Sequence, residues 1–294
     1  MRPLRSVFLI LIFGLAFTSP ACAPRPPEPA LWKISDHNSE IWLFGTVHVL
    51  PPSLAWRRSH VDAAFARADI VVFEADVSPE LRPAFDAFVR AEGALPETEQ
   101  LSDRLAPETR EQLLRVARQL GMDSAQLERV RPWLAALQLS LAYALRQGGD
   151  PDIGVDTVLG RAARAQNKRI DYLEAATDQI RAISTLSPEG EARFLKATLS
   201  QIEDDGGRSD ALNRAWSEGD VRTLGRLLDD MSTEAGPEAR SAIITRRNEA
   251  WTQRIQDMLA GEGRIFIAVG AAHLSGEGNV VALLRARGVH VEGP

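Results

Sequence analysis

Cysteine is almost absent from this chain of 294 residues, since the single Cys22 precedes the part expected to fold. Disulfide bonds and thiolate metal ligands are therefore excluded from the folded part. A net positive charge is also absent, because 34 Lys and Arg residues face 40 Asp and Glu residues, for a formal charge of −6. Phosphate binding usually needs a basic face, so we expect no nucleic acid partner.

Long apolar runs are missing too, apart from one near the start. The run Val7 to Phe17 holds eleven uncharged residues and is preceded by Arg2 and Arg5. This length is typical of the core of a secretory signal and is too short to cross a bilayer. We therefore predict that residues 1–22 are a signal peptide and that the protein works in the periplasm or cell envelope.

Cys22 leaves two ways of processing this signal open. It follows a small residue, as in lipoprotein signals, where the cysteine carries the acyl chains, although Ser19 stands where such signals usually have Leu. Cleavage after Ala23 is the alternative, but it would leave Pro24 directly behind the cut. We favour a lipid on Cys22, which would be the protein's single link to a membrane.

The remainder divides into a proline-rich linker, 23–30, and one domain, 31–294. Apolar runs indicate buried strands near both ends of this domain, and helical spacing dominates between about 79 and 260. The predicted strands are 41–44, 70–73, 169–173, 265–269 and 289–292, and a helix at 56–68 suggests that the first two are neighbours. We expect an α/β fold with a central mixed sheet from the N- and C-terminal parts, flanked by helices, with a large helical insertion between.

Two of these strands end in the same pattern. Four apolar residues precede Gly45-Thr46-Val47-His48, and four precede Gly270-Ala271-Ala272-His273, so the two histidines share one setting 225 residues apart. Sheets of this class place ligands at the carboxyl ends of their strands. One such histidine alone is more often an interior residue bonded to a carbonyl, but the repeated context favours a shared site.

A carboxylate ends the third strand. Glu74 follows the run 70–73, and a buried carboxylate needs a cation or hydrogen-bond donors, although an arginine partner or an exposed strand end would also account for it. Two imidazoles and one carboxylate suit Mn²⁺, Co²⁺ or Zn²⁺, which would acidify a bound water. We predict His48, Glu74 and His273 as metal ligands and catalytic residues, or two of them as ligands and the third as general base.

Two polar residues fall on an apolar helical stripe that includes Ile244 and Trp251. Arg247 and Asn248 on this buried face require partners, so they are candidates for steadying a ligand or binding a reaction oxyanion. An internal salt bridge and a helix hydrogen bond explain them equally well. We interpret Asp156 as a helix cap. Glu174, at a strand end, could have either a structural or a functional role. The remaining histidines read as surface residues: His37, His60 and His290.

The paired Gly-x-x-His motifs and Glu74 resemble the TraB/GumN family, which is related to the Tiki metalloproteases. Further stretches fit the same family pattern: Arg131-Pro132-Trp133-Leu134, Gly154-Val155-Asp156, Tyr172-Leu173-Glu174, Ala215-Trp216 and Arg247-Asn248. The resemblance runs from about Leu31 to the C-terminus. It implies a fold similar to the erythromycin-esterase and ChaN-like group, and Mn²⁺- or Co²⁺-dependent peptide cleavage at His48, Glu74 and His273.

The leading expectation is an exported metal-dependent hydrolase, a peptidase of the TraB/GumN–Tiki type, acting on a peptide or small-molecule substrate. A first alternative is a metal-free, esterase-like hydrolase in which His and Glu activate water. A second is a ChaN-like lipoprotein that binds haem or another ligand. The two tyrosines, Tyr143 and Tyr172, lie in the helical insertion, which weakens a Tyr-ligated haem site. A third alternative is a family member that keeps the fold but has lost catalytic activity.

Overall fold

The computed structural model describes residues 28–76, 78 and 80–294. The predicted signal peptide, Cys22 and most of the proline-rich linker lie outside these residues. In this described part, no helix is both long and apolar enough to cross a membrane.

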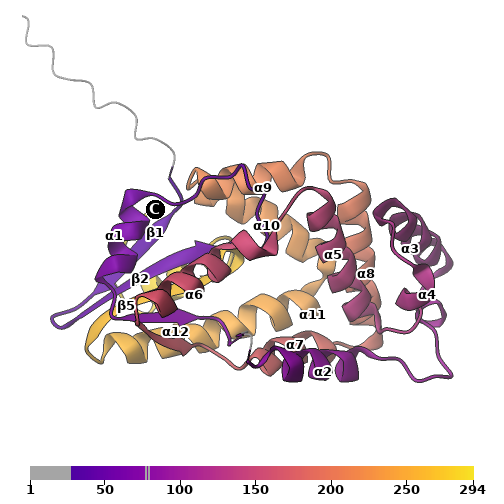
Figure 1. The fold of residues 1–294 in the computed structure, drawn as a ribbon, viewed down its shortest axis with the longest axis horizontal. Helices are drawn as coiled ribbons and strands as arrows, with labels where there is room; N and C mark the ends of the chain where they lie inside the picture. Colours follow the sequence, from indigo (N-terminus) through magenta and orange to yellow (C-terminus); the bar gives the residue numbers. More distant parts are fainter. Residues whose placement is uncertain (1–27, 77, 79) are drawn as a thin grey trace, which may run out of the picture.

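Six strands form one mixed sheet in the order β4-β3-β5-β2-β1-β6. They are β1 (Leu31–Ser35), β2 (Ser39–Thr46), β3 (Ile70–Phe73), β4 (Arg169–Tyr172), β5 (Gly263–Gly270) and β6 (Val291–Glu292). Strands β4, β3, β5 and β2 are parallel, whereas β1 pairs antiparallel with β2, and β6 antiparallel with β1. The carboxyl ends of the four parallel strands therefore lie at one end of the sheet, facing the helical part (Figure 1).

Most helices come between β3 and β5 along the chain. The α-helices are α1 (Ser59–Arg67), α2 (Arg82–Gly93), α3 (Pro107–Leu120), α4 (Ser124–Leu127), α5 (Pro132–Arg146), α6 (Val155–Ala165), α7 (Ala176–Ser184), α8 (Pro188–Glu203), α9 (Arg208–Ser217), α10 (Val221–Ala235), α11 (Pro237–Arg240), α12 (Arg246–Leu259) and α13 (Val280–Ala286). Short turns are η1 (Leu101–Arg104), η2 (Pro151–Ile153), the π-helical η3 (Ser241–Thr245) and η4 (Ala271–His273).

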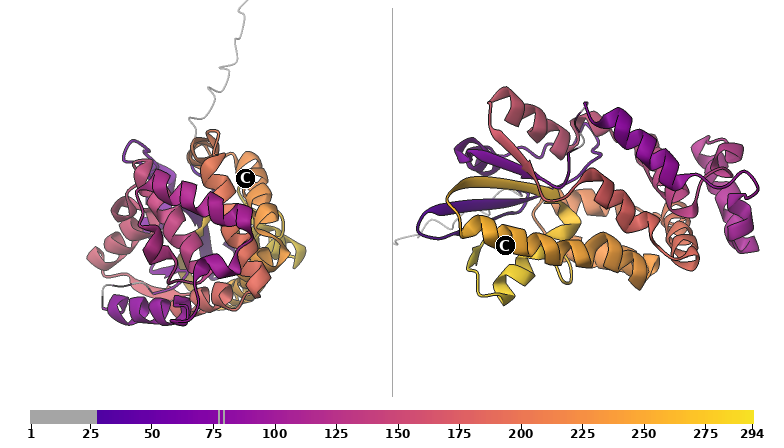
Figure 2. Two further views of the ribbon diagram at one scale, coloured as in Figure 1. Left: turned by 90° about the vertical axis from the view of Figure 1, so that its right-hand side faces the viewer. Right: turned by 90° about the horizontal axis from the view of Figure 1, so that it is seen from below.

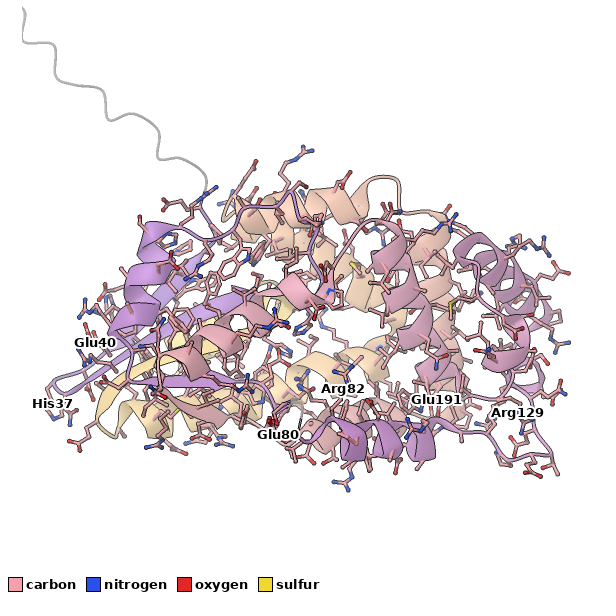
Figure 3. The ribbon with its side chains drawn as sticks, viewed as in Figure 1. His37, Glu40, Glu80, Arg82, Arg129 and Glu191 are labelled. Atoms are coloured by element: carbon pink, nitrogen blue, oxygen red, sulfur yellow. The ribbon has the colours of Figure 1, made fainter. Side chains whose placement is uncertain are left out.

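Helices cover both faces of the sheet. On one face α1 and α6 pack on β2 and β5, with Phe65 and Leu159 in the same apolar cluster as Phe266. On the other face α12 and α13 bury Trp251 and Leu284 against the sheet. Helices α3, α5 and α8 form a further core beyond the carboxyl ends of the strands (Figure 2). The turn between β1 and β2 lies at the opposite end, where His37 projects outward (Figure 3).

The predicted fold class is confirmed, including the sheet built from both ends of the chain and the helical insertion. One prediction was wrong: β2 and β3 are not neighbours, because β5 lies between them. Residues Ile265 to Val269 are apolar throughout and fully buried, so this strand can pair on both sides. Strand β1 was also not predicted.

Candidate active site

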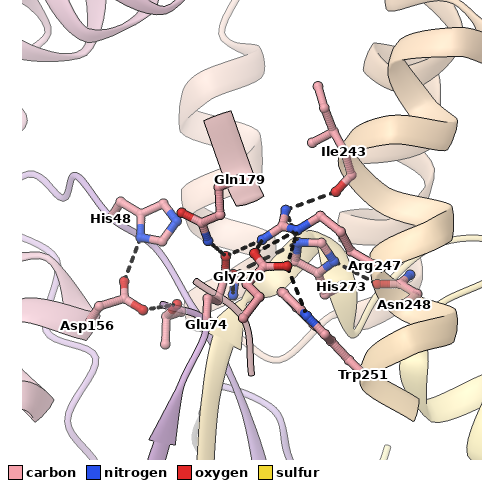
Figure 4. Close-up of polar contacts among 12 residues, drawn as sticks. His48, Glu74, Asp156, Gln179, Ile243, Arg247, Asn248, Trp251, Gly270 and His273 are labelled. Carbon is pink, nitrogen blue, oxygen red and sulfur yellow. Dashed lines mark hydrogen bonds and ion pairs between the residues drawn. The ribbon is translucent and has the colours of Figure 1, made fainter. Parts of the chain in front are cut away.

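The end of the parallel sheet brings three predicted residues together. Thr46 lies opposite Gly270 in the β2–β5 pairing, and β3 ends beside β5, so the chain leaves these strands at nearly the same level. A Cβ atom placed on Gly270 would lie 3.0 Å from Glu74 Oε1, 3.6 Å from His273 Cδ2 and 3.9 Å from His48 Nε2. Glycine leaves this point open, and the three side chains converge on it (Figure 4).

A cavity of about 550 Å³ opens above this point. Its lining includes His48, Glu74, Arg247 and His273, and continues over α9, α10 and η3. This volume falls in the range of pockets that bind small organic ligands, roughly 300–1,000 Å³.

Asp156 holds the ring of His48. One carboxylate oxygen of Asp156 lies 2.7 Å from His48 Nδ1, and the other accepts a 2.7 Å hydrogen bond from the Thr46 hydroxyl. Helix α6 can begin this close because a Cβ on Gly154 would lie 2.1 Å from the carbonyl oxygen of His48. The Asp156 carboxylate raises the pKa of His48 to about 9, and Glu74 adds to this effect. The ring nevertheless faces the cavity and is 67% exposed.

Glu74 is buried, and both of its carboxylate oxygens accept hydrogen bonds. Its Oε1 accepts a 2.6 Å hydrogen bond from the Gly270 N–H, and its Oε2 accepts from Arg247 Nη2 at 2.7 Å and from Gln179 Nε2 at 2.9 Å. Burial opposes the charged form, but Arg247, the charge on His48 and the Gly270 N–H outweigh it and lower the pKa of Glu74. The carboxylate is therefore ionised at neutral pH.

Asn248 fixes the orientation of His273. Asn248 Nδ2 donates to the Gly278 carbonyl, so its Oδ1 accepts from His273 Nδ1 at 2.7 Å. The proton therefore sits on Nδ1, and the unprotonated Nε2 faces Arg247 Nη1 at 3.2 Å and lies 3.9 Å from Glu74 Oε1. The Trp251 ring packs against the His273 ring, with 4.3 Å between the two ring centroids. Burial lowers the pKa of His273 to about 3, so this imidazole is neutral.

All five N–H donors of Arg247 face acceptors within the protein. Two go to Glu174, one each to the Ile243 carbonyl and Glu74, and one faces His273 Nε2 at 3.2 Å. Its side chain is 13% exposed, like that of Glu174. Arg247 thus forms the internal salt bridge that the sequence allowed, with no donor left over for a substrate oxyanion.

Within the cluster, Glu74 and His273 have the donor types and protonation states that a divalent metal needs. Two ligand atoms on one Zn²⁺-like ion, each bonded at roughly 2.0–2.2 Å, can stand up to about 4.4 Å apart. The 3.9 Å between Glu74 Oε1 and His273 Nε2 lies within that limit but is wider than the ~3.4 Å of tetrahedral coordination, so the two side chains would have to move closer together on a tetrahedral metal. Both histidines also have Nδ1 held by an oxygen, as metal-binding histidines do. Across the described residues, no three His, Cys, Asp or Glu side chains form a complete metal-ligand group, so the fit rests on the pair.

All five predicted site residues, His48, Glu74, Arg247, Asn248 and His273, lie in this cluster, and their catalytic and metal-binding roles remain predictions. Asn248 is fully buried and reaches the cavity through His273 rather than directly.

Three other outcomes correct or complete the prediction. Asp156 is not the helix cap, because Gly154 holds that position and Asp156 bonds His48 instead. Gln179 was missed, since a glutamine within a helix gives no signal in the sequence. His60, predicted as a surface residue, is partly exposed, and its Nε2 lies 3.0 Å from the Pro29 carbonyl.

Comparison with known proteins identifies the family of this chain. The model of the TraB/PrgY/gumN family matches residues 30–293, so the chain belongs to that family. The chain is 26% identical to the uncharacterized protein YbaP of Escherichia coli (strain K12) over 248 residues, which cover 84% of this chain and 89% of YbaP. It is 24% identical over 299 residues to an uncharacterized protein of Treponema pallidum (strain Nichols), covering 96% of this chain and 89% of that protein. The resemblance in the sequence is confirmed.

Proposed function

We propose that this protein is a metal-dependent hydrolase of the peptidase type and that the cavity above Gly270 is its active site. The observation that supports this most is the convergence of Glu74, His273 and His48 on one point at the cavity floor. A buried carboxylate, a neutral imidazole and a second, solvent-facing imidazole provide metal ligands and a proton-transfer group in one place.

The proposal gives the three residues different roles, each based on its contacts. Glu74 Oε1 and His273 Nε2 are the pair that would hold the metal, whose chemistry is to acidify a water and polarise a carbonyl. His48 faces the cavity with Nε2 while Asp156 holds Nδ1, so it is the group that gives or takes a proton at the substrate. Asn248 keeps His273 in the tautomer that exposes a lone pair.

Metal affinity and peptide cleavage, measured on the same variants, test this division. We expect Glu74→Gln and His273→Ala to lose both metal binding and cleavage. We expect His48→Ala to keep metal binding and lose cleavage, while the exposed His37→Ala, the matched control, keeps both. Equal metal uptake by wild type, Glu74→Gln and His273→Ala would refute the metal site.

One observation favours metal-free hydrolysis as a second candidate. Arg247 already places a positive charge on Glu74 Oε2 and His273 Nε2, and the raised pKa of His48 provides a protonated acid opposite the Glu74 carboxylate. In this case Glu74 would accept a proton from water while His48 donates one to the leaving group. Cleavage that survives exhaustive chelation would select this mechanism.

Export and haem binding stay predictions. Incorporation of labelled fatty acid that is lost in Cys22→Ser would support lipid anchoring, and recovery in a periplasmic fraction would support cleavage alone. Tyr143 lines the cavity, so a haem absorption band that appears on titration and disappears in Tyr143→Phe would support the ligand-binding alternative.

A further inference from the structure

Aliphatic side chains bracket the reactive groups within the cavity. Val47 and Val49 stand on either side of His48 in the chain, and Ile243 and Ile244 precede Arg247 by one helical turn. Further apolar lining comes from Pro51, Leu212, Trp216, Leu224 and Leu228. A ligand whose reacting bond lies at the cavity floor therefore meets apolar surface directly beside that bond.

The π-helical turn η3 places two consecutive isoleucines in this wall. Its wider turn brings both Ile243 and Ile244 into the lining, while the Ile243 carbonyl accepts a 2.9 Å hydrogen bond from Arg247. Such π-turns inside helices occur frequently at functional sites. The wall is thereby tied to the catalytic cluster through one hydrogen bond.

These side chains keep part of their surface uncovered. Val47, Leu228, Ile243 and Ile244 are all only partly buried. Trp216 uses its indole N–H on the Gly45 carbonyl, so it offers the cavity only carbon. Covering such surface with an apolar group is favourable, whereas placing a charge against it is not.

The charge of the lining acts in the same direction. Asp205 and Asp210 lie on the wall formed by the start of α9, and neither forms an ion pair within residues 28–76, 78 and 80–294. The described lining contains no lysine and no arginine other than Arg247, whose donors are all used. A carboxylate on the substrate would find only one further cationic group here, the His48 imidazole, and its charge is already paired with Asp156.

We propose that the cavity selects peptides with an aliphatic or aromatic side chain next to the bond that is cleaved, and rejects acidic side chains there. This inference rests on the proposed hydrolase function, since it places the cleaved bond at the cavity floor. Ile244 is the specificity-determining residue of the wall, and Leu228 contributes on the facing helix α10.

Internally quenched peptides that differ only at the residue beside the scissile bond provide the test, with Leu, Ala, Lys or Asp at that position. We expect kcat/KM for the Leu peptide to exceed that for the Asp peptide at least tenfold. Ile244→Ala should lower the Leu value by about tenfold or more, as expected for lost methylene contacts in an apolar pocket. Leu141→Ala, which removes an aliphatic side chain 47% exposed and outside the lining, should change nothing.

Binding of the same peptides to His48→Ala, followed by fluorescence anisotropy, separates recognition from cleavage. Selective binding of the Leu peptide that weakens in His48→Ala/Ile244→Ala, without any cleavage by wild type, would sustain the inference and remove the hydrolase. Cleavage or binding with equal preference for Leu and Asp would overturn the inference and leave the hydrolase standing. Leu228→Ala is tested in parallel. If Ile244→Ala fails to fold, loss of the preference for the Leu peptide in Leu228→Ala supports the inference, and an unchanged preference overturns it.

Discussion

Replacing Arg247 by glutamine should destabilise the protein strongly. Arg247 is the cation shared by Glu74 and Glu174, and the exposed fractions of these three side chains are only 11–13%. Glutamine removes the charge and leaves two buried carboxylates facing each other. Removing one partner of a buried ion pair costs about 3–5 kcal/mol. For a domain of this size, at about 2 °C per kcal/mol, that corresponds to a fall in Tm of roughly 6–10 °C.

Thermal and urea unfolding of Arg264→Gln provide the matched control. Arg264 also makes two hydrogen bonds to one carboxylate, that of Asp69, but this pair is 50% and 58% exposed. Its loss should cost about 1 kcal/mol or less. Equal losses of stability in the two variants would show that Arg247 does not neutralise buried charge, and the account of the site would fail.

The same variant makes a prediction about pH. In the wild type the lowered pKa of Glu74 means that its charged form stabilises the fold above its unfolded pKa, near 4.5, and that this contribution fades as pH falls through the folded pKa. Without Arg247 the Glu74 carboxylate loses one of the groups that favour its charged form. The stability difference between wild type and Arg247→Gln should therefore shrink as pH is lowered below about 4.5. A difference that stays constant down to pH 3 would contradict this.

Metal affinity should change in the opposite direction to stability. A metal bound to Glu74 and His273 has to take the Nε2 lone pair that Arg247 now faces at 3.2 Å. Arg247→Gln removes both this competition and a repelling charge, so Mn²⁺ should bind about tenfold tighter or more, which corresponds to about 1.4 kcal/mol. Titration calorimetry measures this directly. Unchanged or weaker binding would place the metal elsewhere.

Three further variants test single parts of the site. Asp156→Asn should bring the pKa of His48, measured by NMR, from about 9 toward 6.5. The wild type should lose stability as pH rises from 6.5 to 9, and the variant should not show this loss. A pKa still above 8 in the variant would contradict the pairing. Asn248→Ala should weaken metal binding roughly 10- to 100-fold, because His273 loses the partner that orients it, and unchanged affinity would exclude this role. Gly270→Ala should fold, since its backbone (φ −51°, ψ 135°) suits alanine, but the added methyl should block metal binding and cleavage; full activity would move the site elsewhere.

Local sequence patterns predicted the strands well and their order poorly. The apolar runs of β2, β3 and β5 are strong signals because strands buried on both faces must be apolar throughout. Which strand lies beside which depends instead on the chain's path through space. Strand β5 follows β3 by nearly 190 residues, yet it inserts between β3 and β2. No local pattern records this choice.

The same distinction separates the predicted from the missed site residues. His48, Glu74 and His273 each come within three residues of the end of an apolar strand, so their places at the carboxyl end of the sheet could be predicted. Asp156 lies in the first turn of a helix, where acidic residues are common for reasons of helix stability alone. Its bond to a histidine 108 residues away depends on where α6 docks, and the sequence does not show that.

The repeated Gly-x-x-His motif yields two histidines with opposite properties. In the β2–β5 register, Gly45 lies opposite Val269 and Thr46 opposite Gly270, so the two motifs are displaced by one residue. One consequence is that Gly270 faces the cluster while Gly45 is packed against Ala271. The other is that the two histidines have different partners.

His48 is exposed to the cavity and paired with a carboxylate, which raises its pKa to about 9, whereas His273 is buried and paired with an amide, and burial lowers its pKa to about 3. Environments that drive two titratable groups apart in this way commonly assign them different tasks in catalysis. A permanently neutral imidazole suits a ligand, and a protonatable one at the cavity wall suits proton transfer. The displacement by one residue thus gives a physical basis for dividing the roles that the sequence left undivided.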